Sequence, residues 1–184
     1  MSSPGPGATA RLFYAVVPDE ATRERIARAA AALTLDSGAR LVPRNNYHAT
    51  LAFVGEIPAA SIPALREVGR AQAAAAFSMR LDTLDFWPKP AVVVARASAV
   101  PDPLEALWQR LHQDLAGHGW ARNPKRLRPH VTLARQVTCS PAFSDMSVVW
   151  EARDFSLMSS DTSGPDPVYT VLDTWPLLYG HGPA

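Results

Sequence analysis

The sequence predicts an α+β fold of two pseudo-symmetric lobes, each an antiparallel sheet with outer helices, and three observations indicate it. Helical segments alternate with pairs of short strands along the chain. A short phrase occurs twice, as HATLAF at residues 48–53 and as HVTLAR at 130–135. The length of 184 residues and the hydrophobic content of 47% suit one such domain with a sizeable core. A single ferredoxin-like layer fits the same order of elements and stays open at this point.

The first strand and helix are separated by two adjacent residues. An apolar run that starts at Leu12 ends at Pro18, which has no backbone N–H for a strand ladder. Asp19 follows and is a favourable N-cap residue for the helix behind it. The apolar side chains of that helix recur at helical spacing and comprise Ile26, Ala30 and Leu33.

A second strand pair and a second helix come next. Strand patterns span residues 40–42 and 47–54 around a turn, and we expect Gly55 to end the second strand. Ser61 then precedes a helix whose apolar face comprises Ile62, Leu65 and Val68.

The second half of the chain repeats this order. Alternation from Met79 and the β-branched run 92–94 predict two strands on either side of a proline-rich turn. The most regular helix spans residues 102–116, with an acid and a proline at its start. Its apolar stripe is expected to be core and comprises Leu104, Leu107, Trp108, Leu111 and Leu115. Further strands are predicted from His130, at 150–158 and at 168–177.

Each copy of the repeated phrase contains a His-x-Thr. Side chains alternate between the two faces of a strand, so the histidine and the threonine point the same way while the residue between them points to the core. Two such strands that face one another across a central cleft would surround one spot with two imidazoles and two hydroxyls. This combination suits a phosphoryl group that is attacked on one side and loses a leaving group on the other.

Six segments together resemble the 2H phosphoesterase superfamily, and within it most closely the RNA 2',3'-cyclic phosphodiesterases, also called 2'-5' RNA ligases. They are RLFYAVVP, ARLVPRNNYHATLAFVGE, RLRPHVTLAR and YTVLDTWPL, with HATLAF and HVTLAR inside the middle two. The resemblance covers residues 11–179 and implies two antiparallel sheets around a cleft. It also implies an enzyme that hydrolyses RNA or oligonucleotide ends bearing a 2',3'-cyclic phosphate to 2'-phosphomonoesters, and it leaves reversible 2'-5' ligation open.

Two histidines suffice for that chemistry without a metal or another cofactor. An imidazole has an ordinary pKa near 6.5, so one ring can be neutral while its neighbour is charged near pH 7. Spacing alone does not distinguish their roles, but the resemblance implies that His48 is the proton donor and His130 the proton acceptor. Thr50 and Thr132 can donate hydrogen bonds to the phosphate oxygens.

Phe53 and Arg135 follow the two histidines at the same offset of five residues. In a regular strand an odd offset places them on the face opposite the imidazole, so they reach the cleft only if the strand ends, twists or bulges. The resemblance nevertheless implies that both hold the terminal nucleoside, as aromatic and guanidinium groups hold single-stranded RNA. The remaining histidines, His112, His118 and His181, are expected to have surface or structural roles.

Composition and charge limit the partners and the cellular compartment that the sequence predicts. The net charge is only +1, but fourteen residues without an acid carry a local basic rim: Arg122, Lys125, Arg126, Arg128 and Arg135. Cys139 is the single cysteine, which excludes an intramolecular disulfide, and no run of 18 apolar residues occurs. We therefore expect a cytoplasmic monomer without a membrane partner, with residues 1–10 as a disordered tail and residues 11–180 as one bilobal domain.

Three alternatives remain from the sequence. A metal hydrolase could use both motif histidines as ligands, but neither motif supplies a third ligand at short spacing. A non-enzymatic module that binds RNA ends has only the basic rim in its favour. In the third alternative, the chain is a 2H phosphoesterase whose substrate is a small cyclic nucleotide, an ADP-ribose cyclic phosphate or a 2'-5' oligoadenylate.

Overall fold

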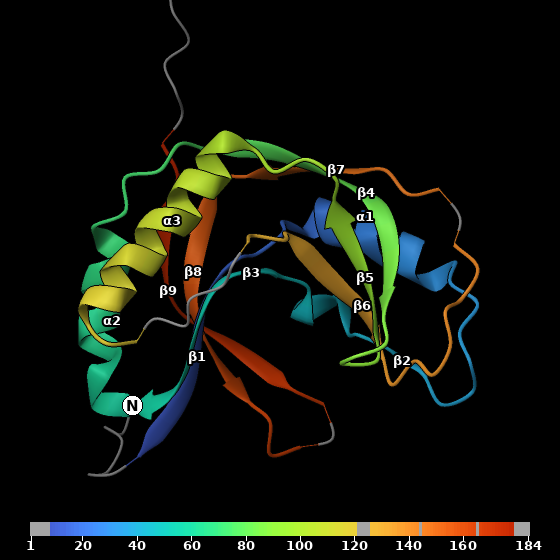
Figure 1. Cartoon of the computed structure of the whole chain (residues 1–184), viewed down its shortest axis with the longest axis horizontal. Coiled ribbons are helices and arrows are strands. Elements are labelled where there is room, and N and C mark those ends of the chain that lie inside the picture. Colours follow the sequence, from blue (N-terminus) through green and yellow to red (C-terminus); the bar gives the residue numbers. More distant parts are fainter. Residues whose placement is uncertain (1–7, 121–125, 144, 165, 179–184) are drawn as a thin grey trace, which may run out of the picture.

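The computed structural model describes residues 8–120, 126–143, 145–164 and 166–178, which form two antiparallel sheets with helices on their outer sides (Figure 1). The first sheet has the strand order β3-β1-β8-β9, and the second has the order β2-β6-β5-β4-β7. The strands of the first sheet are β1 (Thr9–Val16), β3 (Ala49–Pro58), β8 (Asp154–Asp161) and β9 (Val168–Pro176). Those of the second are β2 (Arg40–Leu41), β4 (Phe77–Trp87), β5 (Val92–Ala97), β6 (His130–Arg135) and β7 (Val148–Ala152). The predicted fold class is confirmed.

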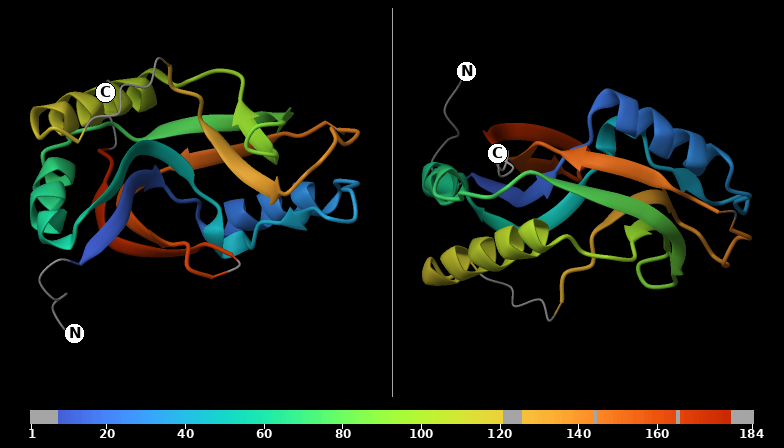
Figure 2. Two further views of the ribbon diagram at one scale, coloured as in Figure 1. Left: turned by 60° about the horizontal axis from the view of Figure 1, so that its bottom comes forward. Right: turned by 90° about the horizontal axis from the view of Figure 1, so that it is seen from above.

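The lobes are not successive halves of the chain. The hairpin of β8 and β9 from the C-terminal part completes the first sheet beside β1, whereas β2 and β4 from the N-terminal part join the second. The helices, too, pack on strands from the other part of the chain (Figure 2). The helix α1 (Glu20–Ala31) packs on β6 and β7, and α3 (Asp102–Gly117) packs on β3, while α2 (Ile62–Arg70) lies against β8 and β9. Two short 3-10 helices, η1 (Arg44–Asn46) and η2 (Ala59–Ser61), precede β3 and α2.

Two expected boundaries are wrong. The strand β1 begins at Thr9, which pairs with Pro58, so residues 9 and 10 belong to the sheet and not to a tail. Gly55 does not end the second motif-side strand: it lies inside β3 with φ of 100°. A glycine adopts this left-handed conformation without strain, so the strand kinks there and continues. Residues 1–7, Arg122, Lys125 and His181 lie outside the described residues.

One hydrophobic cluster joins the inner faces of both sheets and the helices. Tyr14, Trp150 and Phe155 are among its largest fully buried side chains, and the Tyr14 hydroxyl donates a hydrogen bond of 2.6 Å to the backbone oxygen of Leu65 on α2. The four leucines of the α3 stripe are buried as predicted. Trp108 is the exception, because it is only partly buried and lines a surface pocket.

The capping residue Asp19 is confirmed, since its side chain accepts a hydrogen bond of 2.7 Å from the backbone N–H of Thr22. Within the described ranges, no helix has the length and apolar character needed to cross a membrane.

Candidate active site

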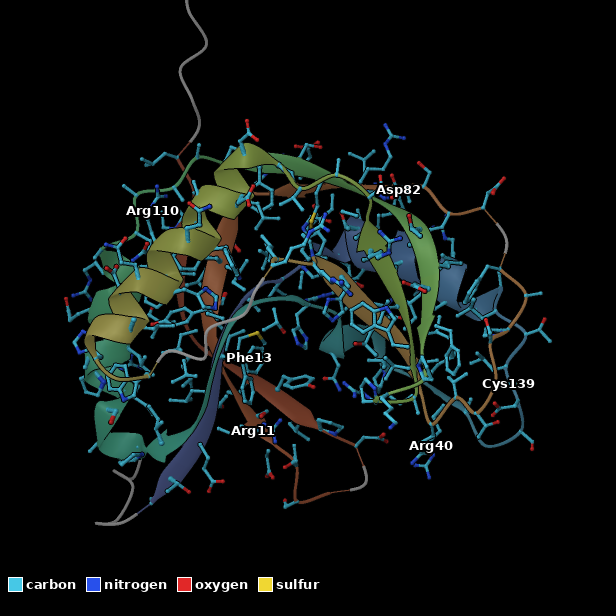
Figure 3. All side chains as sticks on the ribbon, viewed as in Figure 1. Arg11, Phe13, Arg40, Asp82, Arg110 and Cys139 are labelled. Atoms are coloured by element: carbon cyan, nitrogen blue, oxygen red, sulfur yellow. The ribbon has the colours of Figure 1, made fainter. Side chains whose placement is uncertain are left out.

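The His48 imidazole is held from its own segment and by two aromatic rings. It directly precedes β3, and its Nδ1 lies 2.7 Å from the backbone oxygen of Asn46. A carbonyl oxygen only accepts, so Nδ1 carries the proton in this contact and Nε2 is the nitrogen left for a substrate. The rings of Phe13 and Tyr169 lie against the imidazole, with centroid distances of 5.1 and 4.7 Å. Phe13 comes from β1, near the middle of the molecule (Figure 3).

The His130 imidazole has an equivalent environment in the second sheet. It is the first residue of β6, and its Nδ1 lies 2.7 Å from the backbone oxygen of Arg128, again two residues earlier in the chain. The ring of Trp87 lies on it with a centroid distance of 4.6 Å. The indole Nε1 of Trp87 donates to Asp85, which orients the ring. Both motif histidines therefore present Nε2 with the same tautomer.

Burial changes the protonation of both rings. It lowers the pKa of His48 to about 4; the hydrogen bond with Asn46 opposes this shift, and the positive charges of His130 and Arg135 add to it. Burial also lowers the pKa of His130 from its ordinary value. Without a ligand both imidazoles are thus neutral near pH 7, which differs from the expected pair of one charged and one neutral ring.

A β-bulge in each motif strand brings Phe53 and Arg135 to the imidazole face. In β3, Thr50 pairs with Ala15 and Ala52 with Tyr14, so Leu51 is an extra residue. In β6, Thr132 pairs with Val94 and Ala134 with Val93, so Leu133 is an extra residue. The leucine and the alanine after it are both buried in each strand. The alternation therefore slips by one, and the residue at offset five returns to the half-buried face that carries the threonine.

Residues of each motif share surroundings with the histidine of the other motif. Thr50 and Phe53 from β3 line one pocket together with His130. Arg135 from β6 instead acts electrostatically on His48 and shares a second pocket with Tyr169, which contacts the His48 ring. Phe53 thus shares a pocket with the histidine of the other motif, and the charge of Arg135 acts on the histidine of the other motif. The fold brings together both histidines, Thr50, Phe53 and Arg135, and Thr132 is half-buried between His130 and Arg135 on the same face.

Sequence reasoning missed several residues around the histidines. Phe13 and Tyr169 lie in two of the segments that carry the resemblance, and Trp87 precedes the proline-rich turn, but no local pattern shows that they meet an imidazole. His112 also lines the pocket of Phe53, although a surface or structural role was expected. Its position four residues after Trp108, on the same helix face, is the signal that could have found it.

The single cysteine and a possible metal site are the two other candidates for chemistry. Cys139 is exposed in a loop beyond the second sheet, far from the centre of the molecule (Figure 3). Its neighbour Thr138 is tied to Asp36 by two hydrogen bonds of 2.8 Å. In the part of the chain that the structure describes, no three His, Cys, Asp or Glu side chains are grouped so that they could hold a metal ion.

Comparisons with known proteins agree on one family. The family model described as LigT like Phosphoesterase matches residues 16–95. The chain is 32% identical to an RNA 2',3'-cyclic phosphodiesterase of Thermus thermophilus, over 94% of this chain and 92% of the relative. It is 28% identical to that of Escherichia coli, over 91% and 96%. Among solved structures, E. coli LigT complexed with 3'-AMP superposes with a TM-score of 0.84 at 27% identity, covering 92% of this chain and 99% of that one.

Proposed function

Because this chain belongs to the family of LigT-like phosphoesterases, we infer that it is an RNA 2',3'-cyclic phosphodiesterase that opens the cyclic phosphate to a 2'-phosphomonoester. The observation that carries this function is the pair of motif histidines, each with Nδ1 bound to a backbone carbonyl at 2.7 Å. This pairing leaves two Nε2 atoms in one site for two proton transfers, which is what the hydrolysis of a cyclic diester needs.

In the reaction that we propose, His130 accepts a proton from water as the water oxygen forms its bond to phosphorus. His48 donates a proton to the ribose 3'-oxygen as the bond from phosphorus to that oxygen breaks. The products are a 3'-hydroxyl and a 2'-phosphate, and the two imidazoles have exchanged protonation states. With the 5'-hydroxyl of another RNA in place of water as the nucleophile, the same steps in the same direction would form a 2'-5' linkage.

The bound phosphate has a part in this scheme. The pKa of His48 is lowered to about 4 in the free site, so His48 needs a nearby anion to hold the proton that it donates. A phosphate diester between the two Nε2 atoms supplies that negative charge and favours the imidazolium. Thr50 and Thr132 are proposed to donate hydrogen bonds to the non-bridging oxygens, where charge builds up during attack.

The two offset-five residues are proposed to hold the terminal nucleotide. Arg135 lies on the His48 side of the site, where a guanidinium can bind phosphate oxygens with two parallel hydrogen bonds. Phe53 lies on the His130 side and presents an aromatic ring, over which Arg11 lies at 4.8 Å. The bulges at Leu51 and Leu133 support both assignments, because without them these side chains would face the core.

Product analysis tests the proposed function. The purified protein is incubated with an oligonucleotide that ends in a 2',3'-cyclic phosphate, with EDTA present, and the position of the phosphate in the product is identified. We expect turnover to a 2'-phosphate that EDTA does not reduce. A 3'-phosphate would reverse the proposed roles of the histidines, and activity that depends on added divalent metal would contradict the metal-free mechanism. Parallel reactions with small cyclic nucleotides and 2'-5' oligoadenylates test the other substrate classes.

We also propose that the protein acts as a monomer in the cytoplasm. The rings of Phe13, Tyr169 and Trp87 from the same protomer lie against the two motif histidines, which supports a site formed within one protomer. A single exposed cysteine suits a reducing compartment. Light scattering coupled to size exclusion should give the mass of one chain, 19.9 kDa.

A further inference from the structure

A pocket of about 260 Å³ opens beside the catalytic pair, and part of it has no role in the mechanism above. Three separate segments line it. They are the motif strand with Thr50, Leu51 and Phe53, the helix α3 with Trp108 and His112, and the connector with Arg126, Leu127 and Arg128 that leads to His130. Trp108 and His112 are the two aromatic side chains of this pocket that lie outside both motifs and have no role in the mechanism above.

His112 has a defined hydrogen-bonding pattern. Its Nδ1 lies 2.8 Å from the backbone oxygen of Trp108, one helical turn earlier, and its ring packs on the Trp108 indole with a centroid distance of 4.7 Å. The carbonyl only accepts, so Nδ1 carries the proton. In the neutral ring Nε2 is then an acceptor. Burial lowers the pKa of His112, which keeps the ring in that neutral form.

We propose that this pocket binds the base of the nucleotide that carries the cyclic phosphate, with Nε2 of His112 accepting a hydrogen bond from an exocyclic amino group on the edge of that base. The inference rests on the proposed function and deepens it, because it assigns base recognition to α3, outside both motifs.

The chemistry of the lining suits a nucleobase. A base has apolar faces and a polar edge, and the pocket offers the rings of Phe53 and Trp108 for the faces and one acceptor for the edge. His130 and Thr50 lie in the wall of the same pocket, so a phosphate between the catalytic histidines has its own ribose and base beside this opening. The volume is slightly below the range of about 300–1,000 Å³ that is typical for drug-sized ligands, which fits a nucleoside.

Two substrates test the hydrogen bond without any mutation. They are dinucleotides with a 2',3'-cyclic phosphate end that differ only in the last base, which is adenine in one and unsubstituted purine, lacking the 6-amino group, in the other. We expect the wild-type kcat/KM to favour adenine by roughly 2- to 12-fold, the range of one net hydrogen bond. Equal kcat/KM values for the two substrates would overturn the proposal.

Variants then assign the preference to His112. His112→Phe keeps an aromatic ring but removes the acceptor, so the ratio of the two kcat/KM values should fall to about one. His112→Gln keeps an acceptor and should retain part of the preference. The matched control is His118→Phe, since His118 also stacks on a tryptophan, Trp120, at 4.9 Å but does not line this pocket. If His112→Phe kept the wild-type ratio of the two kcat/KM values, the assignment to His112 would be refuted, whatever the result for His118→Phe.

A binding measurement separates failure of the pocket from failure of the proposed function. If the wild-type protein turns over neither dinucleotide, the proposed function is wrong, and the pocket is then tested with adenosine 2'-monophosphate. Binding in the pocket should quench the fluorescence of Trp108, so the wild-type protein should respond more strongly than Trp108→Phe. An equal response of the two proteins, or no response of the wild type, would overturn the pocket inference by itself.

Discussion

Leu51 and Leu133 occupy matching positions: each is the extra residue of a β-bulge, three residues after a motif histidine. Both leucines are buried, and each is followed by a buried alanine. Each bulge shifts the alternation of side chains between the two faces by one residue. As a result Phe53 and Arg135 share a face with Thr50 and Thr132. The repeated phrase therefore repeats a local backbone conformation as well as a sequence.

His48→Ala and His130→Ala should each lower kcat by about 10²- to 10⁴-fold, because each removes one proton-transfer group. Both variants should keep the wild-type circular dichroism spectrum, since both imidazoles are only partly buried. His118→Ala serves as a control and should keep full activity. A kcat of a tenth of wild type or more in either motif variant would contradict a two-histidine mechanism.

Arg135→Lys and Arg135→Gln should separate the charge of this residue from its shape. Lysine keeps the charge but lacks the planar fork, so KM for a cyclic phosphate end should rise while the pKa of His48 stays where it is. Glutamine removes the charge that helps to lower the pKa of His48, so that pKa should rise. NMR titration of the His48 ring proton measures it, and a pKa in Arg135→Gln equal to that of wild type would show that the two side chains are not electrostatically coupled.

The pH dependence of kcat/KM should be bell-shaped, with its maximum on the acidic side of pH 6.5. This profile reports the free enzyme, in which burial lowers the pKa of both His48, to about 4, and His130. Above these values the site lacks the one proton that it needs, so kcat/KM should fall as pH rises. The two apparent pKa values of this profile belong to the coupled pair of histidines and not to either residue alone.

The pH dependence of kcat should lie at higher pH than that of kcat/KM, because it reports the complex in which bound phosphate favours the imidazolium. Rates measured from pH 4 to 9 over a range of substrate concentrations give both profiles. A flat kcat/KM profile, or one with its maximum above pH 7, would sink this account of the site.

Folding stability should also depend on His48. The unfolded imidazole has a pKa near 6.5 and the folded one about 4, so the unfolded state binds more protons below pH 6.5 and stability is lost as pH falls. Between pH 7.5 and 5 this single group should cost about 2 kcal/mol. His48→Gln lacks the titrating group, and urea unfolding at both pH values should show a smaller loss for it. Parallel losses in the two proteins would contradict the buried neutral ring.

Gly69→Ala should destabilise the protein although alanine favours a helix. Gly69 lies in α2, and a Cβ there would meet the ring of Trp175, which is itself packed against Tyr14 and Phe155. Overpacking typically costs about 1–3 kcal/mol, which outweighs the gain of about 1 kcal/mol in helix propensity. Gly117→Ala in α3 is the control, because nothing lies within 4 Å of its Cβ and only the gain applies. Thermal unfolding of the two variants should give shifts of opposite sign.

The amino-acid sequence by itself determined what depends on near neighbours in the chain. Strand period places His48 with Thr50 and His130 with Thr132, helical period buries the leucines of α3, and Asp19 begins α1. These features depend on side chains within a few residues of one another, so local patterns predict them. The doubled motif also indicated that the two strands meet in one site.

The tertiary structure decided what depends on partners distant in sequence. The bulges at Leu51 and Leu133 exist only relative to β1 and β5, so no single strand reveals them. The pKa of His48 depends on burial beneath Phe13 and Tyr169, from strands more than 150 residues apart. His112 and Phe53 line one pocket only because α3 packs on a strand of the other half of the chain. Register, burial and packing are properties of the assembled sheets, and side-chain periodicity in one segment carries no information about them.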